Sequence, residues 1–195
     1  MRIEPGTARF YRYFLIPMLV LCAPLVSAAR DPFVVQHASF SFNQTLLQLD
    51  LVVDSDIPDY IAIAIDQGFA VPFMFEFEIR VEKAYWFDEK IISLKQKYLL
   101  HYLPMLGSFA VFDVNSSVRH YFDNRKAAVR FLEVVYNYPM LDINNLAPDK
   151  EYYARVRFGI DTDELPVPLK SSSLWDNDWD LQSDWYKWEF HRPEK

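Results

Sequence analysis

Apolar and polar residues alternate along residues 73–82. The apolar positions are Phe73, Phe75, Phe77, Ile79 and Val81, and the alternate positions are Met74, Glu76, Glu78, Arg80 and Glu82. Because successive side chains of a β-strand point to opposite faces, this pattern predicts a strand with one apolar face and one face in solvent. Such a strand requires a second layer that covers its apolar face.

The same period-two pattern recurs along residues 47–53 and 152–160. Three half-buried strands of this kind favour an antiparallel sheet with one solvated face. Further strands are expected near residues 34–42, 90–103, 109–115 and 140–143. Asp88 and Glu89 are expected to turn the long strand that ends near Trp86 back into the strand at 90–103.

Two segments have the signals of helices. The first opens at Pro58 and closes at Gly68, the usual residues for a helix start and stop. The second is expected to begin at Asp123 as its capping residue and to end before Pro139. Its apolar stripe comprises Ala128, Phe131, Leu132 and Val135.

About eight strands and two short helices favour a mainly β fold, an antiparallel β-sandwich that is immunoglobulin-like or a related two-layer arrangement. The alternative is an α+β fold in which the two helices cover a single sheet. The length of residues 29–195 predicts a single β-rich domain.

Residues 14–26 form an unbroken apolar run of 13 residues. Arg2, Arg9 and Arg12 precede it, and Ser27, Ala28 and Ala29 follow it. A membrane-spanning helix needs about 20 residues, so this layout favours a secretory signal peptide over residues 1–28, cleaved after Ala28 or Ala29. The expected location is the periplasm, and the alternative is an inner-membrane anchor over residues 10–29.

Cleavage would change the composition in two ways. It removes Cys22, the only cysteine, which excludes disulfides, thiol catalysis and thiolate metal sites. It also removes three arginines and one glutamate, which changes the formal net charge from -7 to -9. An acidic chain argues against nucleic acid and anionic membrane surfaces as partners, because both require many cationic contacts. Contact with the membrane is expected only through an uncleaved leader.

The sequence predicts no catalytic residues, metal site or cofactor. His37, His101, His120 and His191 have no metal-ligand spacing, and no glycine-rich phosphate loop is present. Asp161, Asp163 and Glu164 cluster after a strand and could supply the acid and base of a hydrolase. Asp176, Asp178 and Asp180 begin like a calcium loop, but Leu181 and Lys187 occupy positions that need glycine and glutamate. A solvated acidic surface is the favoured interpretation of both groups.

Four of the five tryptophans lie within 14 residues, at Trp175, Trp179, Trp185 and Trp188. If exposed, these rings could stack on sugars or grip a peptide, so they are the candidate binding residues. If buried, they attach the last strand to the sandwich. Charge is also uneven: residues 90–130 carry seven lysines and arginines against two aspartates, a balance of +5 that could meet an anionic envelope ligand.

Several segments resemble the bacterial domain-of-unknown-function 4390 family. The closing pattern is residues 161–169, DTDELPVPL, followed by residues 179–185, WDLQSDW. Residues 100–103, LHYL, and residues 145–148, NLAP, with Tyr152 and Tyr153 before a strand, agree with it. The resemblance implies an exported protein of Gram-negative bacteria without assigned activity or catalytic residues. Members tend to be encoded near a membrane-bound sensor kinase and its response regulator.

Three functions are therefore considered. The leading hypothesis is a non-catalytic periplasmic binding or accessory domain with an envelope protein or glycan as its partner. The second is an envelope glycan hydrolase that uses Asp161, Asp163 or Glu164. The third is an assembly factor anchored in the inner membrane by its leader.

Overall fold

The computed structural model describes residues 31–82, 88–148, 150–171 and 179–192. The predicted leader, its two cleavage positions and its alternative role as an anchor lie outside this part of the chain. Trp86, Trp175, Asp176 and Asp178 also lie outside it. No helix within the described ranges is long and apolar enough to cross a membrane.

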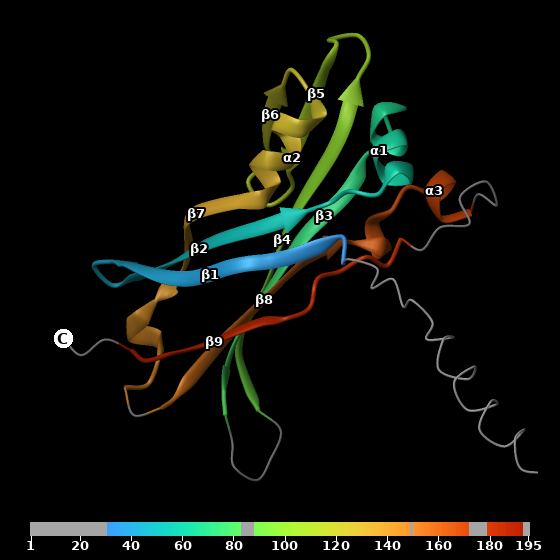
Figure 1. Ribbon diagram of the computed structural model, residues 1–195. Coiled ribbons are helices and arrows are strands. Elements are labelled where there is room, and N and C mark those ends of the chain that lie inside the picture. Colours follow the sequence, from blue (N-terminus) through green and yellow to red (C-terminus); the bar gives the residue numbers. More distant parts are fainter. Residues whose placement is uncertain (1–30, 83–87, 149, 172–178, 193–195) are drawn as a thin grey trace, which may run out of the picture. The chain divides into compact units, whose positions relative to one another are not determined.

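The described chain is built mainly from strands (Figure 1). The strands are β1 (Phe33–Asn43), β2 (Leu46–Ser55), β3 (Val71–Val81), β4 (Glu89–Leu103), β5 (Ser108–Asp113), β6 (Val118–Phe122), β7 (Val134–Asp142), β8 (Tyr152–Ile160) and β9 (Tyr186–Phe190). The helices are α1 (Asp59–Asp66), α2 (Arg125–Glu133) and α3 (Val167–Ser171), with single 3-10 turns η2 (Ile143–Asn145) and η3 (Thr162–Glu164).

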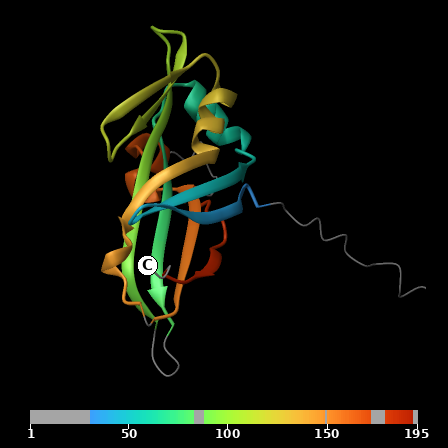
Figure 2. The same cartoon turned by 90° about the vertical axis from the view of Figure 1, so that its left-hand side faces the viewer.

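Two antiparallel sheets form the sandwich. The small sheet has the order β1-β2-β7, and the large sheet has the order β6-β5-β4-β3-β8-β9. Figure 1 shows the small sheet crossing the long strands of the large one, and in Figures 1 and 2 α1 and α2 lie at the same end of the sandwich as the β4–β5 turn. The predicted mainly β, two-layer fold is confirmed.

Aromatic side chains join the two layers. Phe33 of β1 contacts Phe158 of β8 at 5.2 Å between ring centroids, and Phe158 stacks on Phe73 of β3 at 5.8 Å. Farther along β1, Phe40 lies 5.9 Å from Phe77. The alternating apolar positions recognised in the sequence therefore face the space between the sheets.

The prediction of a solvated face on residues 73–82 is wrong for its central glutamates. Glu76 and Glu78 are buried although they lie on the side of β3 that faces away from the small sheet. Their carboxylates accept hydrogen bonds from Arg157 and Arg155, which lie opposite them on β8. The ring of Trp185 in turn covers both arginines, and together these side chains shield the two carboxylates from water.

The second helix also differs from its prediction. Its capping residue is Asn124, not Asp123, and the Asn124 side chain accepts a hydrogen bond from the backbone N–H of Ala127. The helix ends at Glu133, because Val135 pairs with Leu51 of β2 as part of β7. Pro139 lies within β7, an edge strand, where its lack of an N–H is tolerated. Strand β6 was not predicted either.

The segment from Trp179 to Ser183 is held directly against β8. The backbone N–H of Ile160 donates to Leu181 O at 2.9 Å, and that of Ser183 donates to Phe158 O at 2.8 Å. Between these bonds lies Gly159, which forms a bridge with Gln182.

Replacing Gly159 with alanine is expected to lower the free energy of unfolding by about 2 kcal/mol, because overpacking displaces backbone. A Cβ at this position would lie 2.5 Å from Leu181 O and 2.8 Å from Gln182 Cα. Urea denaturation of the purified variant measures the effect. An unchanged unfolding midpoint would show that the segment is held less tightly than these contacts indicate.

Candidate functional site

The three described candidate tryptophans lie in three different surroundings. Trp179 is buried and contacts Tyr60 of α1 at 5.4 Å between centroids. Trp188 is half-buried between the layers, 5.1 Å from Phe40. Trp185 lies on the outer face of the large sheet, where the guanidinium carbons of Arg155 and Arg157 are 4.1 Å and 4.6 Å from its ring. These rings therefore do not form a common platform.

The candidate carboxylates after β8 are tied to a lysine. Lys97 Nζ lies 2.8 Å from Asp161 Oδ2 and 3.0 Å from Glu164 Oε1. Hydrogen bonds to Asp161 and then to Glu164 raise the pKa of Lys97, which keeps it charged. Asp163 is exposed, and its backbone oxygen accepts a hydrogen bond from Lys170. The Lys97 ion pairs fasten η3 to β4.

The described ranges contain no cluster of side chains that could ligate a metal ion. No group of three or more histidine, cysteine, aspartate or glutamate side chains there is arranged to hold a metal ion. Asp180, the described member of the calcium-like pattern, lies beside Trp179 and has an interaction partner of its own.

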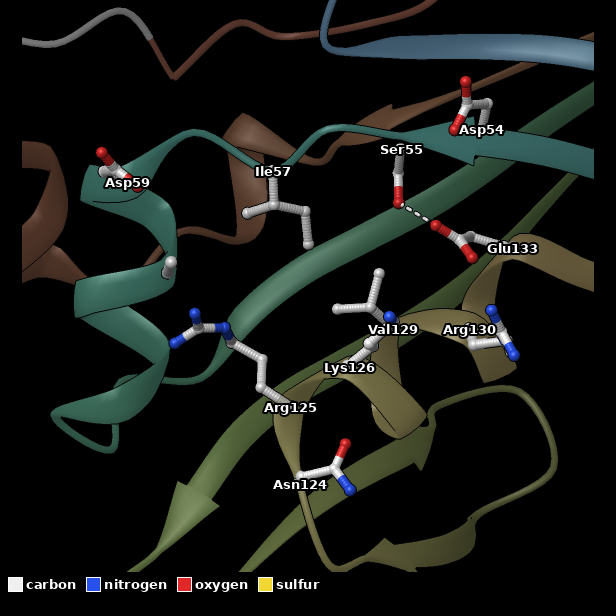
Figure 3. Close-up of a pocket in the computed structure, with 11 residues that line it drawn as sticks. Asp54, Ser55, Ile57, Asp59, Asn124, Arg125, Lys126, Val129, Arg130 and Glu133 are labelled. Carbon is white, nitrogen blue, oxygen red and sulfur yellow. Dashed lines mark hydrogen bonds between the residues drawn. The ribbon is translucent and has the colours of Figure 1, made fainter.

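A groove of about 600 Å³ lies between the end of β2, the start of α1 and one side of α2 (Figure 3). We call it the α1–α2 groove. It is lined by Asp54, Ser55, Ile57, Asp59, Ala62, Asn124, Arg125, Lys126, Val129, Arg130 and Glu133. A volume of this size is typical of small-ligand sites, which range from about 300 to 1,000 Å³.

Helix periodicity places the cations of α2 beside the groove. Lys126 and Arg130 are four residues apart, as are Arg125 and Val129, and residues at this spacing share one side of a helix. Figure 3 shows Val129 directed toward Ile57 on the opposite wall, and Arg125 directed toward α1. The groove therefore combines an apolar floor with cationic side chains on α2.

Carboxylates line the opposite wall. Asp54 is near the end of β2, and Asp59 is in the first turn of α1. Three cations and three carboxylates line the groove, and all three cations come from α2. A ligand with both charges, or an anionic group beside an apolar one, would match this distribution.

Two contacts brace the groove at its ends. Arg125 forms an ion pair with Asp66, which joins the start of α2 to the end of α1. Ser55 Oγ donates a hydrogen bond to Glu133 Oε1 at 2.6 Å, which joins the end of β2 to the end of α2. Within the described part of the chain, Lys126 and Arg130 form no ion pair. Their charges are therefore available to a ligand.

The sequence did not identify these residues as a site. The only sequence signal for these residues was the net positive charge of residues 90–130, a segment that includes Arg125, Lys126 and Arg130. No local motif could reveal the acidic wall, because Asp54 and Asp59 come from a segment about seventy residues earlier in the chain.

Comparison with known proteins supplies the family. Residues 30–189 match the family model described as Domain of unknown function (DUF4390), so the chain belongs to this family, as its motifs indicated. No curated protein and no solved structure matches the chain.

Proposed function

We propose that this member of the DUF4390 family is a non-catalytic binding or accessory domain of the periplasm, and that its ligand lies in the α1–α2 groove. The observation that carries the proposal is the groove itself, whose lining combines an apolar floor, carboxylates of β2 and α1, and the cations Lys126 and Arg130, which form no ion pair within the described chain. The predicted leader supports the location. An accessory role beside a membrane sensor kinase is the setting that fits an exported binding domain.

The chemistry of the groove favours recognition. The Ser55 hydroxyl donates a hydrogen bond to Glu133 at 2.6 Å. The other polar side chains that line the groove are carboxylates, cations and the amide of Asn124. Asn124 caps its own helix through Ala127 N–H. Groups of this kind bind and orient a charged ligand, and they supply specificity through the arrangement of charge.

Reversing both free cations, Lys126→Glu with Arg130→Glu, is expected to lower ligand binding by about tenfold or more, since charge complementarity is lost at the site. The matched control is Lys95→Glu with Lys150→Glu, which alters two other exposed lysines and gives the same change in net charge. Each protein is immobilised, and the components of an envelope extract that it retains are quantified by mass spectrometry.

The three immobilised proteins are compared for the envelope components that each one retains. A component held by the wild type and by the control, but depleted on the groove variant, supports the proposal. The free energy of unfolding of both variants should stay within about 0.5 kcal/mol of the wild-type value, because the altered side chains are exposed. Equal retention by all three proteins would show that the groove is not the binding site.

A further inference from the structure

The turn between β4 and β5, residues 103–107, presents apolar side chains to solvent; we call it the hairpin tip. Met105 is 99% exposed and Leu106 is 65% exposed. Among large apolar side chains that the structure describes, Met105 is the most exposed. Adjacent exposed apolar residues at the end of a projecting element mark an interaction site more strongly than residues scattered singly.

The hairpin tip is held in a defined position. β4 and β5 pair continuously from Tyr98 with Asp113 to Leu103 with Ser108. Within the turn, the N–H of Leu106 donates to Leu103 O at 3.0 Å. Gly107 has a φ of +61°, a left-handed conformation that glycine adopts without strain. A pre-formed turn loses little conformational freedom when it binds, which favours its use as an anchor.

A second hollow lies between the hairpin tip and the α1–α2 groove. This hollow of about 450 Å³ is lined by Gly107 of the tip and by Asn124 and Arg125, which also line the groove. The Arg125–Asp66 ion pair lies where the two hollows meet. A partner seated in the groove would therefore extend naturally to the tip.

Charge indicates which partner fits. The second hollow contains Asp66 and Asp123 against one arginine, and the whole chain has a formal net charge of -7. Together with Lys126 and Arg130 of the adjoining groove, this end of the molecule carries charges of both signs, which a partner of mixed charge matches better than a uniformly anionic bilayer. Tyr102 and Phe109 line the second hollow, but the tip itself presents the non-aromatic side chains of Met105 and Leu106, which fit an apolar pocket better than the flat face of a sugar. An apolar pocket on a protein, surrounded by a mixed-charge rim, complements both the tip and its surroundings.

We infer that Met105 and Leu106 insert into an apolar pocket of a partner protein, and that a charged segment of the same partner occupies the α1–α2 groove. This inference rests on the proposed function and names the ligand class as a protein. Methionine suits such an anchor, because its flexible, polarisable side chain adapts to the shape of the pocket.

The test places a photo-cross-linking amino acid, p-benzoylphenylalanine, at Leu106 in the full chain expressed in its own host. The control places it at Tyr136, an exposed aromatic residue on β7. We expect a protein adduct from position 106 that is absent from position 136. The adduct should also disappear when Lys126→Glu and Arg130→Glu are introduced, because the groove and the tip hold one partner.

The adduct identifies the partner, which is then purified and titrated with the wild type, with Met105→Ser/Leu106→Ser and with the groove variant. The tip variant should bind about tenfold more weakly, as expected for loss of a central apolar anchor. Loss of binding by the groove variant alone would overturn the tip inference and leave the proposed function standing. Unchanged binding by both variants would overturn both.

A lipid partner is tested separately by flotation with vesicles of phosphatidylethanolamine and phosphatidylglycerol. We expect the wild type to remain unbound. The inference would be overturned if the wild type bound the vesicles and Met105→Ser/Leu106→Ser abolished that binding. It would also be overturned if position 106 gave no protein adduct. Both tip side chains are exposed, so the variant is expected to fold normally.

Discussion

Replacing Phe158 with alanine is expected to lower the free energy of unfolding by about 4 kcal/mol, the usual cost of truncating a fully buried aromatic residue. Phe158 lies at the centre of an aromatic cluster and is almost completely buried. Its ring is 5.2 Å from Phe33, 5.8 Å from Phe73 and 4.7 Å from Phe75. The truncation therefore leaves a cavity between β1 of the small sheet and β3 and β8 of the large sheet.

The matched control is Phe42→Ala, which removes the same atoms from a residue on β1 that is 45% exposed. We expect the control to cost less than about 1.5 kcal/mol, because a residue that already lies partly in solvent loses less apolar burial on truncation and leaves no enclosed cavity. Urea denaturation followed by tryptophan fluorescence measures both variants. Equal losses at the two positions would contradict the aromatic cluster as the centre of the core.

The sequence predicts the apolar half of the sandwich well, because the physical signal for it is local. The alternation along β3 assigns Phe73, Phe75 and Phe77 to one face without reference to any other strand. What covers the other face depends on which strands become neighbours. Arg155 lies 77 residues from Glu78, and Arg157 lies 81 residues from Glu76, so a local pattern cannot show their pairing.

The end of α2 shows how tertiary pairing overrides local pattern. Val135 continues the apolar stripe of the helix, but it pairs with Leu51 and belongs to β7. The backbone hydrogen bonds that β7 forms with β2 take the place of those that a further turn of α2 would form. The same rearrangement places Glu133 at the end of the helix, where it accepts the hydrogen bond from Ser55 that closes one end of the groove.

The candidate site was less predictable than the fold for the same reason. Lys126 and Arg130 could be assigned to one side of a helix from their spacing, but the acidic wall and the apolar floor come from the β2–α1 segment. The tryptophans were conspicuous in the sequence because they cluster along the chain. In the folded chain, Trp185 covers a charged network, while Trp179 and Trp188 pack against other aromatic rings.

That charged network centres on Glu78, whose side chain is only 3% exposed. Its carboxylate contacts Lys90, lies 2.6 Å from Arg155 and lies 2.9 Å from Arg80. Burial by itself raises the pKa of this carboxyl group. Hydrogen bonds from Lys90 and Arg155, together with the charges of Arg155 and Arg80, outweigh burial and leave the pKa below its ordinary value.

Replacing Glu78 with glutamine is expected to lower the free energy of unfolding by about 3 kcal/mol at about pH 7, because removing one partner from a buried ionic network leaves the others uncompensated. The control is Glu164→Gln, which breaks the contact with Lys97 at a side chain that is 57% exposed. This exposed pair should contribute less than about 1 kcal/mol. Urea denaturation measures both variants.

The pH dependence separates the charge of Glu78 from its packing. Its pKa is lower in the folded chain than the ordinary value of 4.5, so the unfolded chain binds the proton more readily. The stabilisation by ionised Glu78 is therefore complete above 4.5, and it is lost as the pH falls from there through the lowered pKa of the folded state. The difference between the wild type and Glu78→Gln should shrink over this acidic range. A difference that stays constant throughout it would mean that glutamine disturbs packing, and that the ionic contacts contribute little.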